Sequence, residues 1–525
     1  MSSCSLFKRC GVAVFLIAFN LDGVGNAQVV TALPDEFGYR FSAPPVITPP
    51  APAAVFYVNS DATEEAASKS GADAESAAEK DLTPKELHDA LDARLKELEE
   101  SFSDQEKAAA KAKEDAKKKP TFKINGRIHA DYWSFLNNSP GIGFFEHSDP
   151  TAANFGTDPE DRFAFRRIRM EFGGDIPDNM LWRMQIDFNE PDTPQYKDVY
   201  LGWTHLPNNQ TLLIGNQKRP LGLDHLNSSR YNVFMERPLV VESFNEDARR
   251  VGMCMYGHND QESVNWRYGL YNLENTSESG RYVGDSMQMG GYGRMAFSPY
   301  YDEASDGRGY YHFALAGAVA RPDGNVLPGD SNSNAARFRT RPEARSDARW
   351  IDTRAIAGAD WYETLALESM LNLGPWQFTG EYMATFLQRD NVTTGTGPDV
   401  AFHGFYVYAS YFLTGEHMAY ERNSGTLGRA KPFENFFLVD RLKGGTGQGL
   451  GAWQIAARYD YLDLSSQDIL GGIEQDFTLG LNWYWNAYSK LQTNLIFGDI
   501  DQHRAINGFT SGDFWILGTR FACDF

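Results

Sequence analysis

This 525-residue chain has no long apolar stretch; its longest continuous apolar run, near the start, is short. Mean hydropathy is −0.46, and no internal run reaches about 18 apolar residues, which excludes a bundle of transmembrane helices. Only four cysteines occur, which excludes a disulfide scaffold. Positive charge is also scarce: 49 Lys and Arg against 70 Asp and Glu leave a net charge of −21, which argues against general nucleic-acid binding. What remains is a large β-rich soluble protein or a transmembrane β-barrel, whose alternating residues escape hydropathy analysis.

The first residues have the layout of a secretory signal. Basic residues 8–9 precede an apolar core at 11–19, and small residues follow at 25–27. We therefore expect residues 1–27 to be a signal peptide; the alternative is a buried N-terminal helix.

Two segments of biased composition follow the expected signal. Residues 28–60 are rich in proline and alanine, which predicts an extended linker. Residues 61–119 are dominated by Ala, Glu, Lys and Asp, which predicts a charged helical segment. Its start is expected at Pro84, with Thr83 as the capping residue.

Within this helical segment, a short apolar seam predicts a coiled coil. Leu91, Leu95, Leu98 and Phe102 follow the 4-3-4 spacing of a/d positions. The seam is only about two heptads long, and isolated helices of that length are marginal in water. It therefore needs partner helices, unless the segment is a solvated single helix.

Residues 120–525 have a different pattern, with segments of about ten residues that alternate apolar and polar side chains. In residues 181–188 the apolar side chains occupy even-numbered positions from 182 and the polar ones occupy odd-numbered positions. Residues 197–203, 453–460 and 490–497 repeat the alternation. One apolar and one polar face would also suit a soluble sandwich.

Connector lengths favour the membrane barrel, because short and long links tend to alternate as in outer-membrane proteins. The short links are 174–179, 205–210, 258–263, 374–375 and 486–488, and the long ones include 137–161, 219–248 and 322–362. Residues 415–451 break the pattern, being long where a short turn is due. Residues 514–525 form an alternating segment ending in phenylalanine, which resembles the terminal signal of outer-membrane barrels. We predict an all-β transmembrane antiparallel barrel of about 16 strands, preceded by a periplasmic helical or coiled-coil segment.

One run of residues resembles a known family. Residues 215–230, GNQKRPLGLDHLNSSR, continue to FMER at 234–237 and are similar to the strand-to-loop signature of the phosphate-selective porin O and P family. Residues 165–174, 197–201 and 451–459 are similar to other strands of that family. The resemblance covers roughly residues 121–525. It implies a sixteen-stranded outer-membrane barrel, a homotrimer, and a third outer loop folded into the lumen.

The same resemblance implies a constriction that binds anions through charge-assisted and neutral hydrogen bonds. Its members lie on the second strand and on the inserted loop: Arg166, Arg167, Ser228, Ser229 and Arg237. Asp198 matches a carboxylate that tempers the positive potential. His225 stands where phosphate-specific members carry a lysine, and an imidazole is mostly neutral above about pH 6.5.

Less specific roles stay open for these residues. Arg167, Arg169 and Arg183 would also be explained by ion pairs with Glu171, Asp187 and Asp198 on neighbouring strands. Ser228 and Ser229 would also be explained as turn caps, and His225 as a surface histidine.

We expect passive diffusion of small anions, with inorganic phosphate preferred; the alternatives are a general or sugar-selective porin, or a structural tether. The expected partners are outer-membrane lipid, two further copies of the chain and, through residues 28–119, peptidoglycan. No catalytic motif and no paired-cysteine metal spacing occurs in the sequence, so we expect no enzyme, cofactor or metal.

Overall fold

The computed structural model describes residues 84–117, 119–190, 192–246, 248–275, 288–327, 334–390, 397–437, 439–440 and 445–525. The expected signal peptide and linker lie outside these residues. Two units are distinguished, residues 1–87 and 88–525, and each is described by itself. None of the described helices is long and apolar enough to cross a membrane.

A helix, α1 (Pro84–Lys117), occupies the charged segment, and it begins at the residue that the sequence indicates. Of its apolar seam, Leu95 and Phe102 are exposed to solvent. The association of this helix with other copies stays a prediction.

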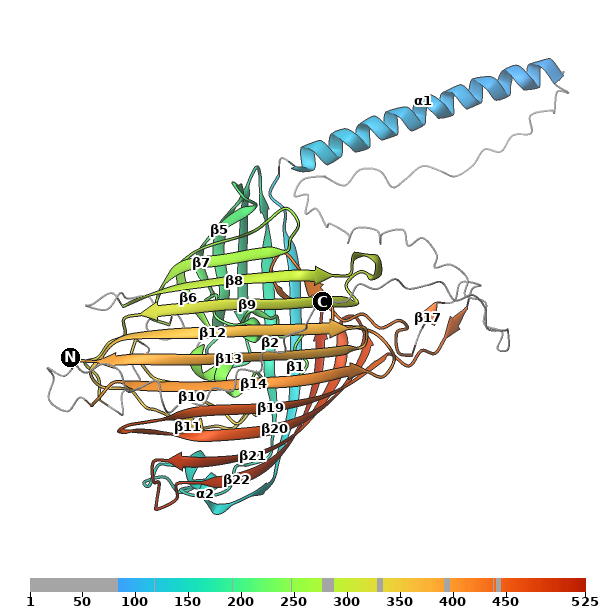
Figure 1. Cartoon of the computed structure of the whole chain (residues 1–525). Coiled ribbons are helices and arrows are strands. Elements are labelled where there is room, and N and C mark those ends of the chain that lie inside the picture. Colours follow the sequence, from blue (N-terminus) through green and yellow to red (C-terminus); the bar gives the residue numbers. More distant parts are fainter. Residues whose placement is uncertain are drawn as a thin grey trace, which may run out of the picture. The chain divides into compact units, whose positions relative to one another are not determined.

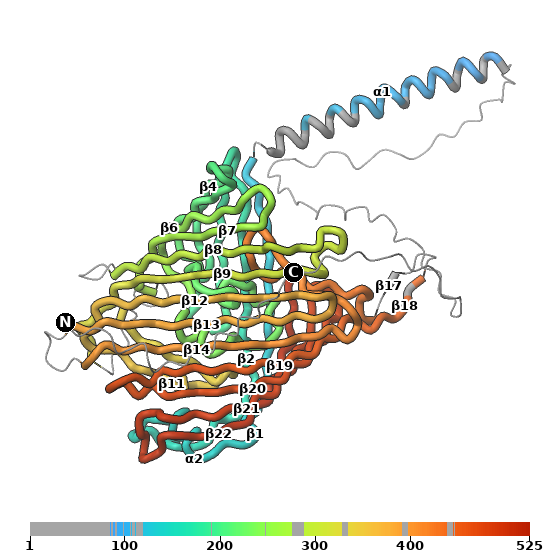
Figure 2. The backbone as a smooth tube through the Cα atoms, in the orientation of Figure 1, coloured from blue at the N-terminus to red at the C-terminus, as the bar shows by residue number. Residues whose placement is uncertain are grey.

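The remainder of the chain is a closed antiparallel barrel of sixteen strands, as predicted (Figures 1 and 2). Each strand pairs with its neighbour in sequence, and β1 closes the barrel against β22. The barrel strands are β1 (Lys123–Asn138), β2 (Arg162–Ile176), β3 (Met180–Asp187), β4 (Gln195–Leu206), β5 (Gln210–Lys218), β6 (Arg249–His258), β7 (Val264–Asn272), β8 (Met289–Tyr301), β9 (Gly309–Ala320), β12 (Ala359–Leu373), β13 (Trp376–Arg389), β14 (Val400–Phe412), β19 (Ala452–Ser466), β20 (Ile469–Asn486), β21 (Ser489–His503) and β22 (Gly512–Asp524).

Alternation along the strands places apolar side chains outward and polar ones inward, the reverse of a soluble protein. On β20, Phe477, Leu479 and Leu481 are exposed, whereas Thr478 and Asn482 are buried. Exposed leucines and aromatics are stable only where the outer surface meets lipid. The wall is therefore a membrane-spanning surface.

The two ends of the barrel differ in the length of their connections. At one end the links at 177–179, 207–209, 259–263, 374–375 and 487–488 are short. Most links at the other end are long, which identifies the short-turn end as periplasmic. Two links break the rule: residues 413–451 are long at the periplasmic end, as the sequence indicates, and residues 467–468 form a short turn at the outer end.

Three of the long links carry small elements of their own and reach into the barrel. The third outer link, 219–248, contains α3 (Leu223–Leu226) and α4 (Leu239–Phe244). The link 321–358 contains β10 (Arg339–Thr340) and β11 (Ile351–Asp352), and 413–451 contains β15 (Tyr420–Glu421), β16 (Thr426–Leu427), β17 (Val439–Asp440) and β18 (Thr446–Gly447). Two further short helices, α2 (Pro140–Glu146) and η2 (Glu303–Ser305), lie in other links.

Candidate functional site: a basic cavity in the barrel lumen

A β-bulge aims two consecutive arginines of β2 into the lumen. His129 on β1 pairs with Arg167, and the next residue, Ala130, pairs with Phe165, so that Arg166 is an extra residue without a partner. A bulge reverses which side chains face inward along a strand. Arg166 and Arg167 therefore both face inward, although strict alternation would place one of them in lipid.

The third outer link is anchored to the far wall by a carboxylate. Glu381 on β13 accepts hydrogen bonds from the backbone N–H groups of Leu223 at 2.7 Å and Asp224 at 2.8 Å, and from the Tyr406 hydroxyl at 2.6 Å. The preceding Gly222 has a φ of 93°, and a Cβ there would lie 2.4 Å from Met383. Glycine is required because only it tolerates both this dihedral angle and this close approach.

The middle of the link, residues 232–235, is held through its carbonyl groups. Lys490 donates to the carbonyl of Asn232 at 2.8 Å, and Asn482 donates to that of Val233 at 2.8 Å. Arg520 donates to the Met235 carbonyl. The link thus crosses the lumen from its roots on β5 and β6 to strands β20–β22, which confirms the inserted loop implied by the family resemblance.

A cavity of about 700 Å³ remains between this link and strands β1–β7. Its lining contains nine arginines, two lysines and one carboxylate, which belongs to Asp198. The cations are Arg127, Arg166, Arg167, Arg169, Arg183, Lys197, Lys218, Arg230, Arg237, Arg249 and Arg267. The chain as a whole carries a net charge of −21, so the lining is opposite in sign to the bulk protein.

Six of these cations have carboxylate partners. The ion pairs are Arg166–Glu236 at 2.8 Å, Arg169–Asp187 at 2.6 Å, Arg183–Glu171 at 2.6 Å, Arg230–Asp524 at 3.3 Å, Arg237–Asp224 at 3.3 Å and Arg249–Asp198 at 2.8 Å. The cross-strand pairing considered for Arg169 and Arg183 is therefore present. Arg167 has no such partner among the residues that the structure describes.

The other five cations have no carboxylate at ion-pair distance among the described residues: Arg127, Arg167, Lys197, Lys218 and Arg267. Arg127 donates to the Ser229 hydroxyl at 2.8 Å, and Arg167 lies 3.2 Å from the His129 ring. The Nε atoms of both arginines are buried without a hydrogen-bond partner. A buried cation without a counter-charge is costly, so this cluster is suited to an anion or ordered water.

The structure brings six of the seven residues expected from sequence to this cavity. Arg166, Arg167, Asp198, Ser228, Ser229 and Arg237 all line it. Arg237 also donates to the carbonyls of Asp224 at 3.1 Å and Asn227 at 3.0 Å, which fixes the turn that carries the two serines. Their contact with a solute stays a proposal.

His225 differs from the expectation, because it does not line the cavity. Its side chain is 2% exposed and packed inside the inserted link, and the Lys218 ammonium donates to its carbonyl at 2.7 Å. Burial and the neighbouring Lys218 and Arg219 lower the pKa of His225 well below its usual value. The ring is therefore neutral and hidden, which corrects both its predicted solute contact and the surface-loop alternative.

Sequence reasoning gave no role to six of the cavity cations. One is Arg230 of the inserted link, and the other five lie on strands β1–β7: Arg127, Lys197, Lys218, Arg249 and Arg267. Strand alternation could have pointed to them as inward residues, but it does not tell which inward residues surround a cavity and which are covered by a loop.

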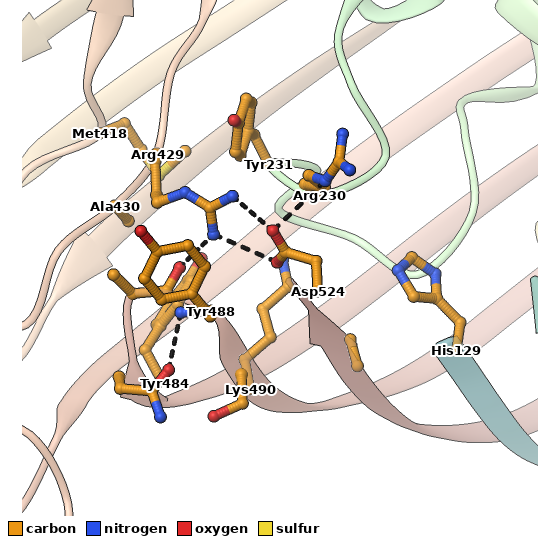
Figure 3. A pocket seen from close by; sticks show the side chains of 14 residues that line it. His129, Arg230, Tyr231, Met418, Arg429, Ala430, Tyr484, Tyr488, Lys490 and Asp524 are labelled. Atoms are coloured by element: carbon orange, nitrogen blue, oxygen red, sulfur yellow. Dashed lines mark hydrogen bonds and ion pairs between the residues drawn. The ribbon is translucent and has the colours of Figure 1, made fainter. Parts of the chain in front are cut away.

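An ionic cluster joins three segments at the periplasmic side of the lumen (Figure 3). Asp524 at the end of β22 pairs with Arg230 of the inserted link at 3.3 Å and with Arg429 of residues 413–451. The Arg429 guanidinium also stacks 4.4 Å from the Tyr488 ring centroid. The inserted outer link and the long periplasmic link therefore meet beneath the cavity.

The closed barrel and its polar, loop-narrowed lumen define an outer-membrane porin, and this fold points to a channel. The sequence profile of the family described as phosphate-selective porin O and P matches residues 142–522, and the chain belongs to that family. Within the described residues, no cluster of three His, Cys, Asp or Glu side chains is arranged to hold a metal ion.

Two curated relatives cover most of the chain. Porin O of Pseudomonas aeruginosa is 23% identical over 435 residues, which is 76% of this chain and 88% of that protein. An uncharacterized protein of Caulobacter vibrioides is 27% identical over 371 residues, 69% of this chain and 68% of that protein.

Solved porin structures show a distant likeness to this chain. The anion-selective porin from Comamonas acidovorans is 12% identical with a TM-score of 0.44, covering 77% of this chain and all of that one. OmpT of Vibrio cholerae is 10% identical with a TM-score of 0.44, covering 77% of this chain and 97% of that one.

Proposed function

We propose that the protein is an anion-selective porin whose solute passes the basic cavity along β1–β7. The observation that carries this proposal is a cluster of five cations that have no carboxylate at ion-pair distance within the described part of the chain: Arg127, Arg167, Lys197, Lys218 and Arg267. An anion entering the cavity compensates a charge that the protein leaves uncompensated. A cation would have to displace part of an existing ion pair to find a carboxylate.

Inorganic phosphate is the solute that the proposal favours. Arginine offers planar paired donors to phosphate oxygens, and the Ser228 and Ser229 hydroxyls offer neutral donors beside them. Because six of the cations are already neutralised, each remaining site is modest in strength. Conduction requires binding that is favourable without being tight, and a series of modest sites meets that requirement.

Reversal potentials in a KCl gradient test the proposal in planar bilayers. We expect anion preference in the natural protein and block of the chloride current by phosphate. Each positive charge is worth about 1 kcal/mol to an anion at 4 Å even in water, so Arg127→Ala with Arg167→Ala should lower the anion-to-cation permeability ratio by about 30-fold.

The matched control removes a cation together with its partner. Arg249→Ala with Asp198→Ala keeps the net charge of the lining and should change the permeability ratio little. Cation preference in the natural protein would contradict the anion mechanism. Block by maltose without block by phosphate would favour a sugar-selective porin.

The proposal includes a homotrimer in the outer membrane, with the segment before the barrel in the periplasm. Strands β3, β5 and β7 have 8, 9 and 9 residues, at or below the length of about 9–11 residues that a tilted strand needs to cross the hydrocarbon core. A wall that contacts another protomer does not need to match the thickness of the lipid, so we place the trimer interface at these short strands. Cross-linking of the purified protein in mild detergent tests the trimer.

A second candidate role, tethering the membrane to peptidoglycan, is favoured by the exposed seam of α1. Leu95 and Phe102 present apolar side chains to solvent on an otherwise charged helix. Deletion of residues 28–119 separates the roles: lost envelope integrity with unchanged conductance supports the tether. Normal envelope integrity after the deletion would leave the channel as the function.

A further inference from the structure

The periplasmic link 413–451 has two limbs with different surroundings. The inner limb, residues 418–430, enters the lumen, where the Gly425 carbonyl accepts a hydrogen bond from Arg294 at 2.9 Å. There the Leu427 N–H donates to the Asn227 side chain of the inserted outer link at 2.9 Å. The outer limb, residues 433–437 and 445–450, remains at the rim of the barrel.

The outer limb is fastened to tryptophans on the lipid-facing side of the wall. The Phe436 N–H donates to the Trp485 carbonyl at 2.6 Å, and its ring packs 4.6 Å from that of Trp483. The Leu450 carbonyl accepts hydrogen bonds from the indoles of Trp483 at 2.9 Å and Trp453 at 3.3 Å. The limb therefore lies on the outer surface of β19 and β20, at their periplasmic ends.

Large apolar side chains of this limb are mostly exposed. Phe433 is 67% exposed, Phe437 58% and Leu450 72%. Exposed apolar groups gathered beside a membrane indicate contact with it, and aromatic side chains are favoured at the level of the headgroups. The periplasmic turn at 207–209, in contrast, consists of Pro-Asn-Asn.

We infer that the outer limb inserts into the periplasmic leaflet of the outer membrane and binds phospholipid. Its aromatic side chains continue the lipid-facing surface of Trp453 and Trp483 without interruption, so the occupant next to that surface is also the occupant next to the limb. Because the inner limb belongs to the same link, the bilayer also helps to hold the residues that line the periplasmic side of the lumen.

Spin labelling of the full-length porin in phosphatidylethanolamine–phosphatidylglycerol vesicles tests this inference. The two free cysteines of the barrel are first replaced, Cys254→Ala and Cys523→Ser. A nitroxide is then placed at Phe437→Cys, with Leu450→Cys as an independent second site in case the first disturbs folding. The matched control is Asn208→Cys, which is exposed on a polar turn at the same end of the barrel.

The readouts are accessibility to oxygen, which partitions into lipid, and to a water-soluble nickel complex. We expect labels at 437 and 450 to show an oxygen-to-nickel accessibility ratio several-fold above that at 208. A ratio equal to that of position 208 places the limb in water and overturns the inference. Low accessibility to both reagents, with dipolar broadening between labels, would show a second copy of the chain as the occupant and would also overturn it.

Discussion

The two halves of the barrel use charge in opposite ways. Along β1–β7, five cations that lack a carboxylate partner among the residues described by the structure surround an open cavity. Along β8–β22, several buried arginines have carboxylate partners: Arg294 pairs with Glu368 at 2.7 Å, and both side chains are fully buried. The comparison teaches that the same inward-facing alternation produces either a passage or a packed core, depending on where the inserted links lie.

Replacing Arg458 should have the largest effect on stability, because its buried ion pairs lie in the half of the barrel formed by β8–β22, here called the packed half. It pairs with Asp460 at 2.7 Å and with Glu343 of the link 321–358, and it donates to the Glu236 carbonyl of the inserted link at 3.2 Å. Arg458→Ala should destabilise the barrel by about 3–5 kcal/mol, because buried carboxylates lose their counter-charge. Urea unfolding followed by tryptophan fluorescence measures this change.

The half of the barrel along β1–β7, which contains the cavity and is here called the open half, supplies the matched control for that experiment. Arg267→Ala removes a cation that contacts the Ser424 carbonyl at 3.3 Å and the Tyr256 ring, without a carboxylate partner among the described residues. It should change stability by less than about 1 kcal/mol while lowering anion preference. Equal losses of stability in the two variants would remove the distinction between the halves.

Glu381 tests whether the packed half positions the inserted link. Glu381→Ala leaves the N–H groups of Leu223 and Asp224 without their acceptor and should cost about 2–4 kcal/mol, with a more mobile link. Protease nicking between 219 and 248 and the noise of the open-channel current measure that mobility. Tyr406→Phe removes only one bond to the same carboxylate and should have a smaller effect. Unchanged nicking would mean that the carbonyl contacts of residues 232–235 suffice.

The buried His225 ring should make the stability of the protein depend on pH. Its pKa in the folded protein lies well below 6.5, so the unfolded chain binds a proton that the folded chain does not. The ring therefore leaves stability unchanged above about pH 6.5 and reduces it below that pH, by up to about 1.4 kcal/mol per pH unit. Between pH 8 and 5 the His225→Gln variant should therefore lose less stability than the natural protein, because only the natural protein has this imidazole to protonate on unfolding. Parallel stability profiles of the two proteins from pH 8 to 5 would contradict a neutral buried ring.

Replacing Asp198, in the cavity along β1–β7, should produce the smallest change in ion selectivity of these variants. Asp198→Asn removes the one carboxylate of the cavity lining and releases Arg249, which it holds through bonds of 2.8 and 2.9 Å. One charge near the path is worth about 1 kcal/mol, so the anion-to-cation permeability ratio should rise about fivefold. Asp501→Asn, on an exposed position of β21, should leave the ratio unchanged because salt screens it from the cavity. A fall in the ratio for Asp198→Asn would show that the ion pair itself shapes the passage.

Local sequence patterns determined the wall of this protein. The period of two along each strand and the short turns between strands are set by neighbouring residues. The sequence therefore predicted the sixteen strands, the start of α1 at Pro84 and the unusual length of residues 415–451. The family signature at 215–237 likewise located the inserted link. Three of the expected site residues, Ser228, Ser229 and Arg237, line the cavity for that reason.

Only the tertiary structure decided what occupies the lumen. The bulge that turns both Arg166 and Arg167 inward depends on pairing with β1, and a sequence run of two arginines does not reveal it. The burial of His225 and the exposure of Lys218 to the cavity depend on how residues 219–248 cross to β20–β22, a contact over more than 200 positions of sequence. Periodicity fixes the side of the wall on which a residue lies, whereas long-range contacts decide whether that side is open or filled.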